Sequence, residues 1–245
     1  MKKHFIYALC FLSILSPVLG QKISKDKKAI MVALDQKEAF YQKTALTIWN
    51  YAEIGYQEYK SSQLLQNILK NEGFTLEVGI AGLPTAFVAS YGSGKPVISM
   101  LAEFDALPGV SQEAVPVRKE RADGHLSGHA CGHHLFGTGI VSAAVEVKNW
   151  MKNNNIKGTL RVHGTPAEEG GSGKVYMARE GLFDDVDMSM YWHAGNQNSV
   201  RVASNLAIAS VKYRFKGIST HAAGAPERGR SALDGVEVMN YMMNM

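Results

Sequence analysis

The chain has 245 residues, of which 46% are hydrophobic and 20% are charged, so it has the composition of an ordinary globular protein that can bury a core. Its formal charge is +4, and two of the 26 basic residues, Lys2 and Lys3, lie in the leader described below, which leaves 24 basic against 22 acidic side chains. This near balance argues against a nucleic-acid or polyanion partner. The length allows one large α/β domain, or one domain and part of a second.

The first twenty residues have the pattern of a secretory signal peptide. Lys2 and Lys3 precede an apolar run over residues 5–15, and Val18 and Gly20 have side chains small enough for cleavage after Gly20. The apolar run is much shorter than the roughly 20 residues that cross a bilayer. We therefore expect an exported protein, periplasmic or extracellular, that has no membrane partner after cleavage.

Hydrophobic periodicity divides the rest of the chain into alternating helices and strands. Apolar residues at helical spacing predict one long helix over residues 27–54 and further helices over 58–71, 135–151, 173–181 and 232–245. Short apolar or alternating runs predict strands at 87–91, 97–104, 159–164, 186–192 and 207–216. This alternation is typical of an α/β protein whose sheet is covered by helices.

The segment between positions 128 and 134 concentrates residue types that bind metal ions. Cys131 is the only cysteine after the predicted leader, and it precedes His133 by two positions in a glycine-rich turn. Four histidines lie within the ten residues around it: His125, His129, His133 and His134. A thiolate and an imidazole at this spacing can reach one cation. A buried inert thiol, a reactive thiol and a cysteine nucleophile paired with His133 are the alternatives.

Polar residues follow three of the predicted strands at the point where each strand ends. Asp105 follows the second predicted strand, Glu168 and Glu169 follow the third, and His193 follows the fourth. Ligand sites in open α/β sheets lie beyond the carboxyl ends of strands, so these residues are site candidates. Of two adjacent carboxylates, one can bind a metal ion and the other can take a proton from water. Each candidate also has a structural alternative. Asp105 could cap a helix or turn, Glu168 and Glu169 could be a solvated surface pair, and His193 could be a satisfied polar histidine.

Two rival motifs fail on their spacing. Residues 170–174 superficially resemble a phosphate-binding loop, but that pattern needs glycine at the position of Glu168 and serine or threonine at the position of Val175. The chain contains no Gly-x-Ser-x-Gly elbow, so a serine hydrolase has little support.

Six motifs stand out together, and they extend from the second predicted strand into the last forty residues. They are Glu103-Phe-Asp105-Ala-Leu-Pro, Gly-His-Ala-Cys131-Gly-His133, Pro-Ala-Glu168-Glu169-Gly-Gly-Ser-Gly-Lys-Val, Gly-Leu-Phe-Asp-Asp-Val-Asp, Trp-His193, and His221-Ala-Ala-Gly followed by Gly-Arg-Ser-Ala-Leu-Asp. In this combination they closely resemble the metal-dependent amidohydrolases of the carboxypeptidase-like zinc peptidase group. The resemblance runs from about residue 27 to the last residue.

The resemblance implies an α/β fold of a particular architecture. A three-layer α/β/α catalytic domain would occupy residues 21–205. Residues 206–245 would begin an inserted α+β, ferredoxin-like domain that serves as lid and dimerisation surface. Partners would be a second copy of the chain, a related A-type subunit, and a small N-acyl or aroyl amino acid as the substrate whose amide bond is hydrolysed.

The resemblance also implies roles for the candidate residues. Cys131, His133, Glu169 and His193 would bind two divalent metal ions, manganese or zinc. Glu168 would be the general base that activates water, and Asp105 would support the metal site. His221 would contact the scissile carbonyl from the partner subunit of a homodimer.

Two departures from the family pattern stand beside this prediction. The family usually has Asp or Asn where this chain has His134, which could change the surroundings of the metal or add a ligand. Chains of the family also continue well past this length to a last metal-binding histidine, so we expect this chain to be C-terminally truncated. A truncated, non-catalytic metal-binding relative and a metallo-dipeptidase or aminopeptidase are therefore the alternative functions.

Overall fold

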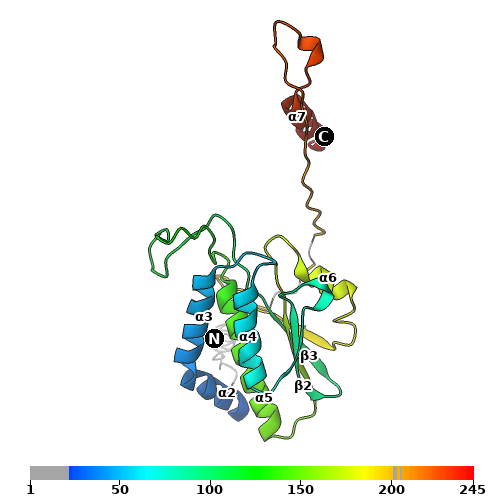
Figure 1. Ribbon diagram of the computed structural model, residues 1–245. Coiled ribbons are helices and arrows are strands. Elements are labelled where there is room, and N and C mark those ends of the chain that lie inside the picture. The colour runs from blue at the N-terminus through cyan, green and yellow to red at the C-terminus, as the bar shows by residue number, and fades with distance from the viewer. Residues whose placement is uncertain (1–21, 201–202, 205) are drawn as a thin grey trace, which may run out of the picture. The chain divides into compact units, whose positions relative to one another are not determined.

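A computed structural model describes residues 22–200, 203–204 and 206–245 (Figure 1). The described residues fall into two compact units that divide between Gly195 and Asn196. The predicted signal peptide over 1–20 and the predicted domain boundary at residue 205 lie outside the described residues. Within the described ranges, no helix is both long enough and apolar enough to span a membrane.

The first unit is built on a five-stranded sheet. In spatial order its strands are β1 (Thr75–Val78), β2 (Phe87–Ser93), β4 (Gly158–Gly164), β3 (Val97–Ala102) and β5 (Met188–Met190). β3 runs parallel to both β4 and β5, whereas β2 is antiparallel to β1 and β4. Because β3, β4 and β5 point the same way, their carboxyl ends meet at one edge of the sheet.

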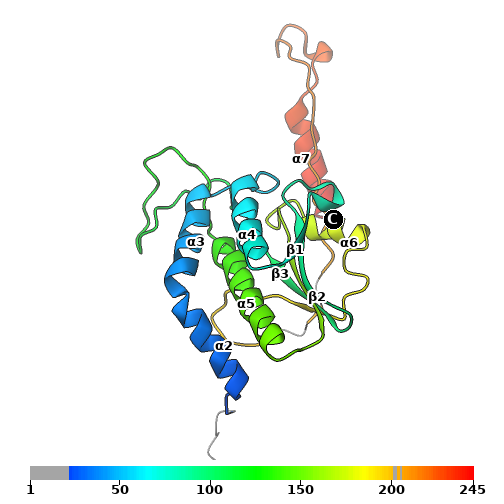
Figure 2. The same ribbon diagram turned by 60° about the horizontal axis from the view of Figure 1, so that its bottom comes forward.

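Helices α2 (Lys25–Gln36), α3 (Glu38–Tyr51), α4 (Tyr59–Asn71) and α5 (His133–Asn153) lie on one side of the sheet (Figure 2). The main core fills the space between them and the strands, with Ile48, Leu65 and Val141 fully buried against β2, β3 and β4. The amphipathic spacing of these side chains is what the sequence shows as helical periodicity, and burying them supplies most of the driving force for packing.

A smaller helix covers part of the other face of the sheet. Met177 of α6 (Gly173–Arg179) packs with Leu83 and Ala86 beside the short 3-10 helix η2 (Ile80–Gly82). On the same face, the ring of His163 lies 4.7 Å from that of Phe183. The sheet is therefore mixed and flanked by helices, as the predicted α/β fold class requires.

The single helix predicted over residues 27–54 is wrong. α2 and α3 are separate helices with a break at Lys37, whose backbone is not helical (φ −104°, ψ 9°). The Lys37 ammonium lies 2.8 Å from a carboxylate oxygen of Glu146 on α5. Periodicity missed the break because both helices keep apolar residues at helical spacing. It also missed β1, which has only four residues.

The second unit contains the 3-10 helix η3 (Pro226–Arg228) and helix α7 (Ala232–Met243). Ser231 caps α7 by accepting a hydrogen bond from the backbone N–H of Asp234. The strand predicted at 207–216 is wrong for the residues that the structure describes, since none of them is paired in a ladder. Alternation alone does not make a strand, because the backbone N–H and C=O groups need a neighbouring strand.

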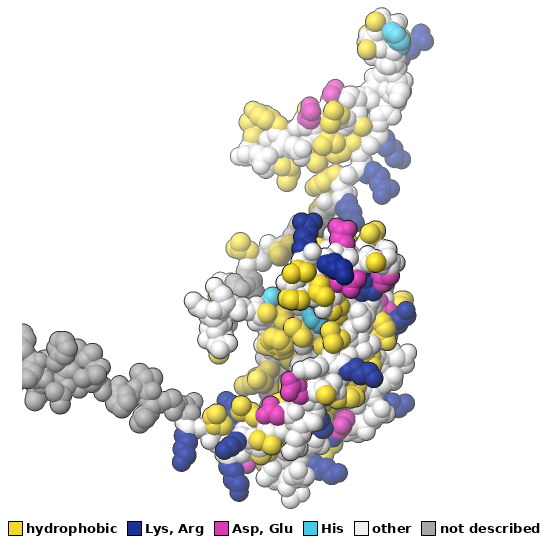
Figure 3. Space-filling model, turned by 90° about the vertical axis from the view of Figure 1, so that its left-hand side faces the viewer, with side chains coloured by type: hydrophobic (Ala, Val, Ile, Leu, Met, Phe, Trp, Pro, Cys, Tyr) yellow, Lys and Arg dark blue, Asp and Glu magenta, His cyan; other side chains and the backbone are white. Residues whose placement is uncertain are grey.

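Figure 3 shows one face of the molecule. On the first unit, Lys and Arg side chains are spread among acidic and hydrophobic ones, and on this face of the described residues they gather in no single basic patch.

Candidate metal centre

The turn before α5 places Cys131 beside His133. Gly132, the N-cap residue of α5, has φ +94°, a left-handed conformation that glycine adopts at no steric cost. His133 is thus the first residue of the helix, and its ring is fully buried, whereas Cys131 is half-buried. The glycine between the two ligand candidates lets the chain turn sharply enough for both side chains to face one site.

Asp105 fixes the orientation of the His133 ring. Nδ1 of His133 lies 2.9 Å from Oδ1 of Asp105 and 3.1 Å from its backbone carbonyl oxygen. Because both neighbours only accept hydrogen bonds, Nδ1 carries the proton of the neutral ring and Nε2 holds the lone pair. Nε2 lies 3.2 Å from Oε2 of Glu103, yet it is buried without a hydrogen-bond partner in the described part of the chain. A cation would satisfy it.

Asp105 also ties two strand ends together. Its second carboxylate oxygen, Oδ2, accepts a hydrogen bond of 3.0 Å from the backbone N–H of Glu169. Burial alone would raise the pKa of Asp105, but the hydrogen bonds from His133 and from the Glu169 amide outweigh it, so the pKa is lowered. One ionised carboxylate therefore joins the ends of β3 and β4 to the start of α5.

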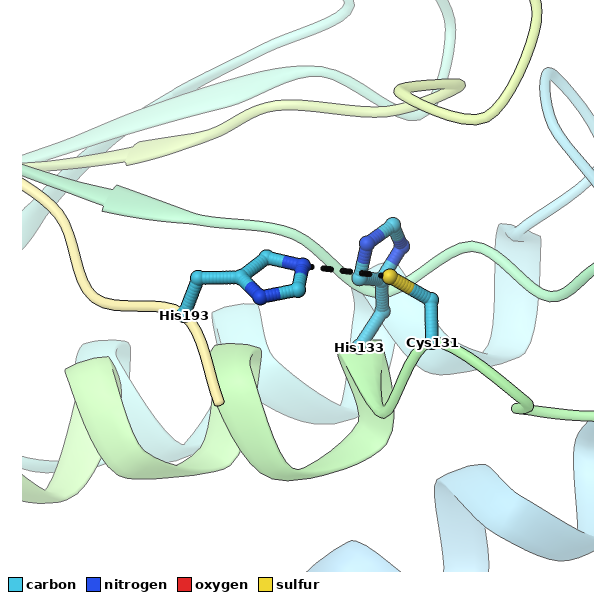
Figure 4. Close-up of side chains that lie close together, drawn as sticks. All are labelled: Cys131, His133 and His193. Atoms are coloured by element: carbon cyan, nitrogen blue, oxygen red, sulfur yellow. Dashed lines mark hydrogen bonds between the residues drawn. The ribbon is translucent and has the colours of Figure 1, made fainter. Parts of the chain in front are cut away.

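Cys131 and His193 approach each other from opposite sides of the site. Figure 4 shows both side chains beside His133, with 3.2 Å between Sγ of Cys131 and Nε2 of His193. The ligand atoms of all three residues lie within 4.8 Å of one another. Burial, followed by the charges of Glu169 and other carboxylates, raises the pKa of Cys131 to about 12. Without a cation this thiol is a poor nucleophile, which weighs against cysteine-based catalysis.

The carboxylates after β4 complete the cluster. A second group with ligand atoms within 4.8 Å of one another comprises Glu103, His133 and Glu168. Oε1 of Glu169 lies 3.9 Å from Nε2 of His133, and within the described residues it is buried without a hydrogen-bond partner. Burial, followed by the charge of Glu103, raises the pKa of Glu168. The donor set of thiolate, imidazoles and carboxylates suits divalent ions such as zinc or manganese.

Glu103 is the site residue that sequence reasoning missed as a candidate. It is 1% exposed, its carboxylate pairs with the ammonium of Lys174 on α6, and its Oε2 accepts a hydrogen bond of 3.2 Å from the hydroxyl of Tyr191. The available signal was its position two residues before Asp105 at the same strand end. Lys174 could not have been paired with it from sequence, since 71 positions separate the two residues.

His134 packs away from this cluster. Its ring stacks edge-on against Trp49, with 4.8 Å between centroids, and lies 5.1 Å from the ring of His129. Burial, followed by the two neighbouring histidines, lowers the pKa of His134 to about 3. In the described part of the chain it belongs to neither group of ligand atoms.

His221 lies in the second unit. There its Nδ1 accepts hydrogen bonds from the backbone N–H groups of Ala223 and Gly224, at 3.2 and 3.0 Å. Its predicted contact with a substrate carbonyl remains a prediction.

Comparison with known proteins places the chain among metallopeptidases. The model of peptidase family M20/M25/M40 matches residues 100–233, which include every member of both ligand groups. The chain is 42% identical over 212 residues to one of the subunits of p-aminobenzoyl-glutamate hydrolase from Escherichia coli (strain K12), an alignment that covers 86% of this chain and 44% of that protein. The chain therefore spans less than half the length of this curated relative.

Two solved structures share the fold. An aminobenzoyl-glutamate utilization protein from Klebsiella pneumoniae superposes with a TM-score of 0.55 at 20% identity, over 83% of this chain and 56% of that one. A dinuclear metal-binding peptidase of the M20 family from Bacillus subtilis superposes with a TM-score of 0.51 at 24% identity, over 63% of this chain and 44% of that one.

Proposed function

Because the chain belongs to peptidase family M20/M25/M40, we propose that the protein is a metal-dependent amidohydrolase that cleaves the amide bond of an N-acyl or aroyl amino acid. The 42% identity to a component of p-aminobenzoyl-glutamate hydrolase makes p-aminobenzoyl-glutamate the first substrate to test. The observation that carries the proposal is the convergence of Cys131, His133 and His193. Two buried acceptor atoms there, Nε2 of His133 and Oε1 of Glu169, have no hydrogen-bond partner in the described residues.

Cys131, His133, Glu169 and His193 would hold two divalent ions, manganese or zinc. The unpartnered Nε2 of His133 and Oε1 of Glu169 fit this role, since each is a lone-pair atom that only a cation or a hydrogen-bond donor could satisfy. Such ions act as Lewis acids, which polarise the amide carbonyl and lower the pKa of water.

Glu168 is suited to move the proton during hydrolysis. Its side chain is half-exposed, and its Oε2 lies 3.8 Å from Nε2 of His133, so it can reach both water and a substrate at the site. Its raised pKa brings it closer to neutral pH, where one carboxylate can take a proton from the attacking water and return it to the leaving nitrogen. Asp105 keeps Nδ1 of His133 protonated, so that Nε2 remains free to bind metal.

Export and assembly belong to the same proposal. The leader pattern of the first twenty residues supports export to a periplasm or the outside. The Escherichia coli relative is one subunit of a hydrolase, which supports an assembly with a related A-type subunit, and a homodimer is the simpler alternative. In either assembly His221 would contact the scissile carbonyl of the substrate.

Glu168→Gln tests the chemistry, made in the protein at its full natural length. Turnover of p-aminobenzoyl-glutamate should fall by about 10²- to 10⁴-fold, because proton transfer is lost. Bound metal should stay unchanged. The matched control is Glu180→Gln, because Glu180 is an exposed carboxylate that follows α6. Unchanged turnover in Glu168→Gln would refute the assigned role. A dipeptide panel separates the amidase from a dipeptidase, and stoichiometric metal without hydrolysis would indicate a non-catalytic relative.

A further inference from the structure

The link between α3 and α4, residues 52–58, lies against two of the segments that carry the proposed site, those that follow β3 and β4. The backbone carbonyl of Glu53 accepts a hydrogen bond of 2.8 Å from the N–H of Ala106, the residue after Asp105. Ile54 forms a parallel bridge with the same alanine. At the other strand end, the hydroxyl of Tyr56 donates a hydrogen bond to the carbonyl of Gly171. This segment holds no residue of the proposed ligand set, so its contacts act on the site through the backbone.

Glu58 makes the most unusual of these contacts. The residue is fully buried, its Oε1 accepts a hydrogen bond of 2.8 Å from the backbone N–H of Ala167, and its Oε2 accepts one of 2.9 Å from the hydroxyl of Thr85. Within the described residues it has no ion pair with a Lys or Arg side chain. A buried carboxylate without a cation is costly, so both of its oxygens depend on these two donors.

The hydrogen bond from Ala167 falls at a strained point of the chain. Ala167 has φ +54°, a left-handed conformation that residues with a Cβ rarely adopt, and it comes directly before Glu168. Its methyl group is buried against Gly55, where an added Cβ would come within 2.9 Å of it. Such conformations persist where the surroundings fix them, and they are common next to functional groups.

We infer that Glu58 is a positioning residue, which holds the left-handed turn at Ala167 and so presents Glu168 and Glu169 to His133. This inference rests on the proposed function of those carboxylates. The backbone N–H of Glu169, two residues further along the turn, donates to Asp105. Two carboxylates, one at the start of α4 and one after β3, therefore hold a turn of three consecutive residues. Both hydrogen bonds of the Glu58 carboxylate go to residues outside the proposed ligand set.

Three substitutions separate positioning from general destabilisation. Glu58→Met keeps the length of the side chain but removes both acceptors. Glu58→Gln is the conservative variant, since its amide oxygen can still accept from Ala167 while its NH₂ group donates to the Thr85 hydroxyl. The double variant Glu58→Met with Ala167→Gly places glycine at position 167, and glycine adopts the left-handed conformation without steric cost.

Glu146→Met is the matched control. Glu146 is also buried, at 5% exposure, and its carboxylate pairs with Lys37. It lies thirteen positions after His133 on α5, which is about 20 Å along the helix axis. Its loss should destabilise the protein without moving the turn.

The first readout is hydrogen exchange of the Ala167 amide, which needs neither metal nor substrate. Glu58→Met should speed this exchange about tenfold, because the loss of one hydrogen bond shifts an equilibrium by about that factor. Glu58→Gln and Glu146→Met should leave it close to wild type. Unchanged exchange in a folded Glu58→Met protein would overturn the inference, whether or not the protein is an enzyme.

The second readout is binding of Co²⁺, whose absorption reports ligation by the thiolate. Glu58→Met should weaken binding about tenfold, and Ala167→Gly added to it should recover part of the loss. The positioning role would be overturned if Ala167→Gly recovered none of the lost Co²⁺ affinity, or if Glu146→Met lost as much Co²⁺ affinity as Glu58→Met. A wild-type protein that binds no Co²⁺ would instead refute the proposed function, and the exchange measurement would still decide what holds the turn.

Discussion

Asp105→Asn changes one oxygen of the proposed site to an NH₂ group, and the structure fixes where that group must go. In the wild-type protein both carboxylate oxygens accept, Oδ1 from Nδ1 of His133 at 2.9 Å and Oδ2 from the backbone N–H of Glu169 at 3.0 Å. The backbone N–H can only donate, so the asparagine oxygen must face Glu169. Its NH₂ group then faces His133, and the imidazole can accept at Nδ1 only if its proton moves to Nε2.

That tautomer is the wrong one for binding metal, because Nε2 is the atom that faces Cys131 and the carboxylates. Loss of a partner that orients a metal-binding histidine typically lowers metal affinity about 10- to 100-fold. Stability should fall by only about 1–2 kcal/mol, because two hydrogen bonds to a charged acceptor are replaced by neutral ones of the same length. The substitution should therefore separate metal binding from folding.

The assay is a Zn²⁺ or Co²⁺ titration beside urea unfolding of the metal-free protein. Asp35→Asn, on the exposed side of α2, is the control and should change neither quantity. The backbone carbonyl of Asp105 also lies 3.1 Å from Nδ1. Metal affinity in Asp105→Asn within about threefold of wild type would show that this carbonyl alone holds the proton on Nδ1, and would refute the argument from the carboxylate.

Two further predictions concern buried charge. Lys174→Met should lower the free energy of unfolding by about 3 kcal/mol in a denaturant titration, because it leaves the buried carboxylate of Glu103 without its cation. A loss below about 1 kcal/mol would mean that the hydrogen bond from Tyr191 is enough to stabilise the Glu103 carboxylate. His163 is fully buried, and burial lowers its pKa to about 4, so the fold favours the neutral ring. The contribution of His163 to the free energy of unfolding should be constant above the unfolded pKa of about 6.5 and fall by about 3 kcal/mol as the pH drops from there to 4. In urea titrations at pH 7 and pH 4, His163→Asn should lose less stability between the two pH values than the wild-type protein does, by about that amount. Equal losses in both proteins would contradict this assignment.

Much of the site was predictable because it rests on local chemistry. Cys131 and His133 lie two positions apart around a glycine, and that spacing alone brings a thiol and an imidazole to one turn. Asp105, Glu168 and His193 each follow an apolar run, and parallel strands bring their carboxyl ends to one edge of a sheet. The convergence of these residues thus followed from the order of strands and polar residues in the chain.

Contacts between distant segments decided the rest. Glu103 pairs with Lys174 on α6, and the ring of His134 packs against Trp49 on α3, so each contact joins segments that are far apart in the sequence. Lys37, at the break between α2 and α3, pairs with a carboxylate of α5. Periodicity reports how a segment relates to its own neighbours, whereas partner, burial and orientation depend on residues far along the chain. For this protein the sequence by itself determined which side chains could form a metal site, and only the tertiary structure decided how they are held.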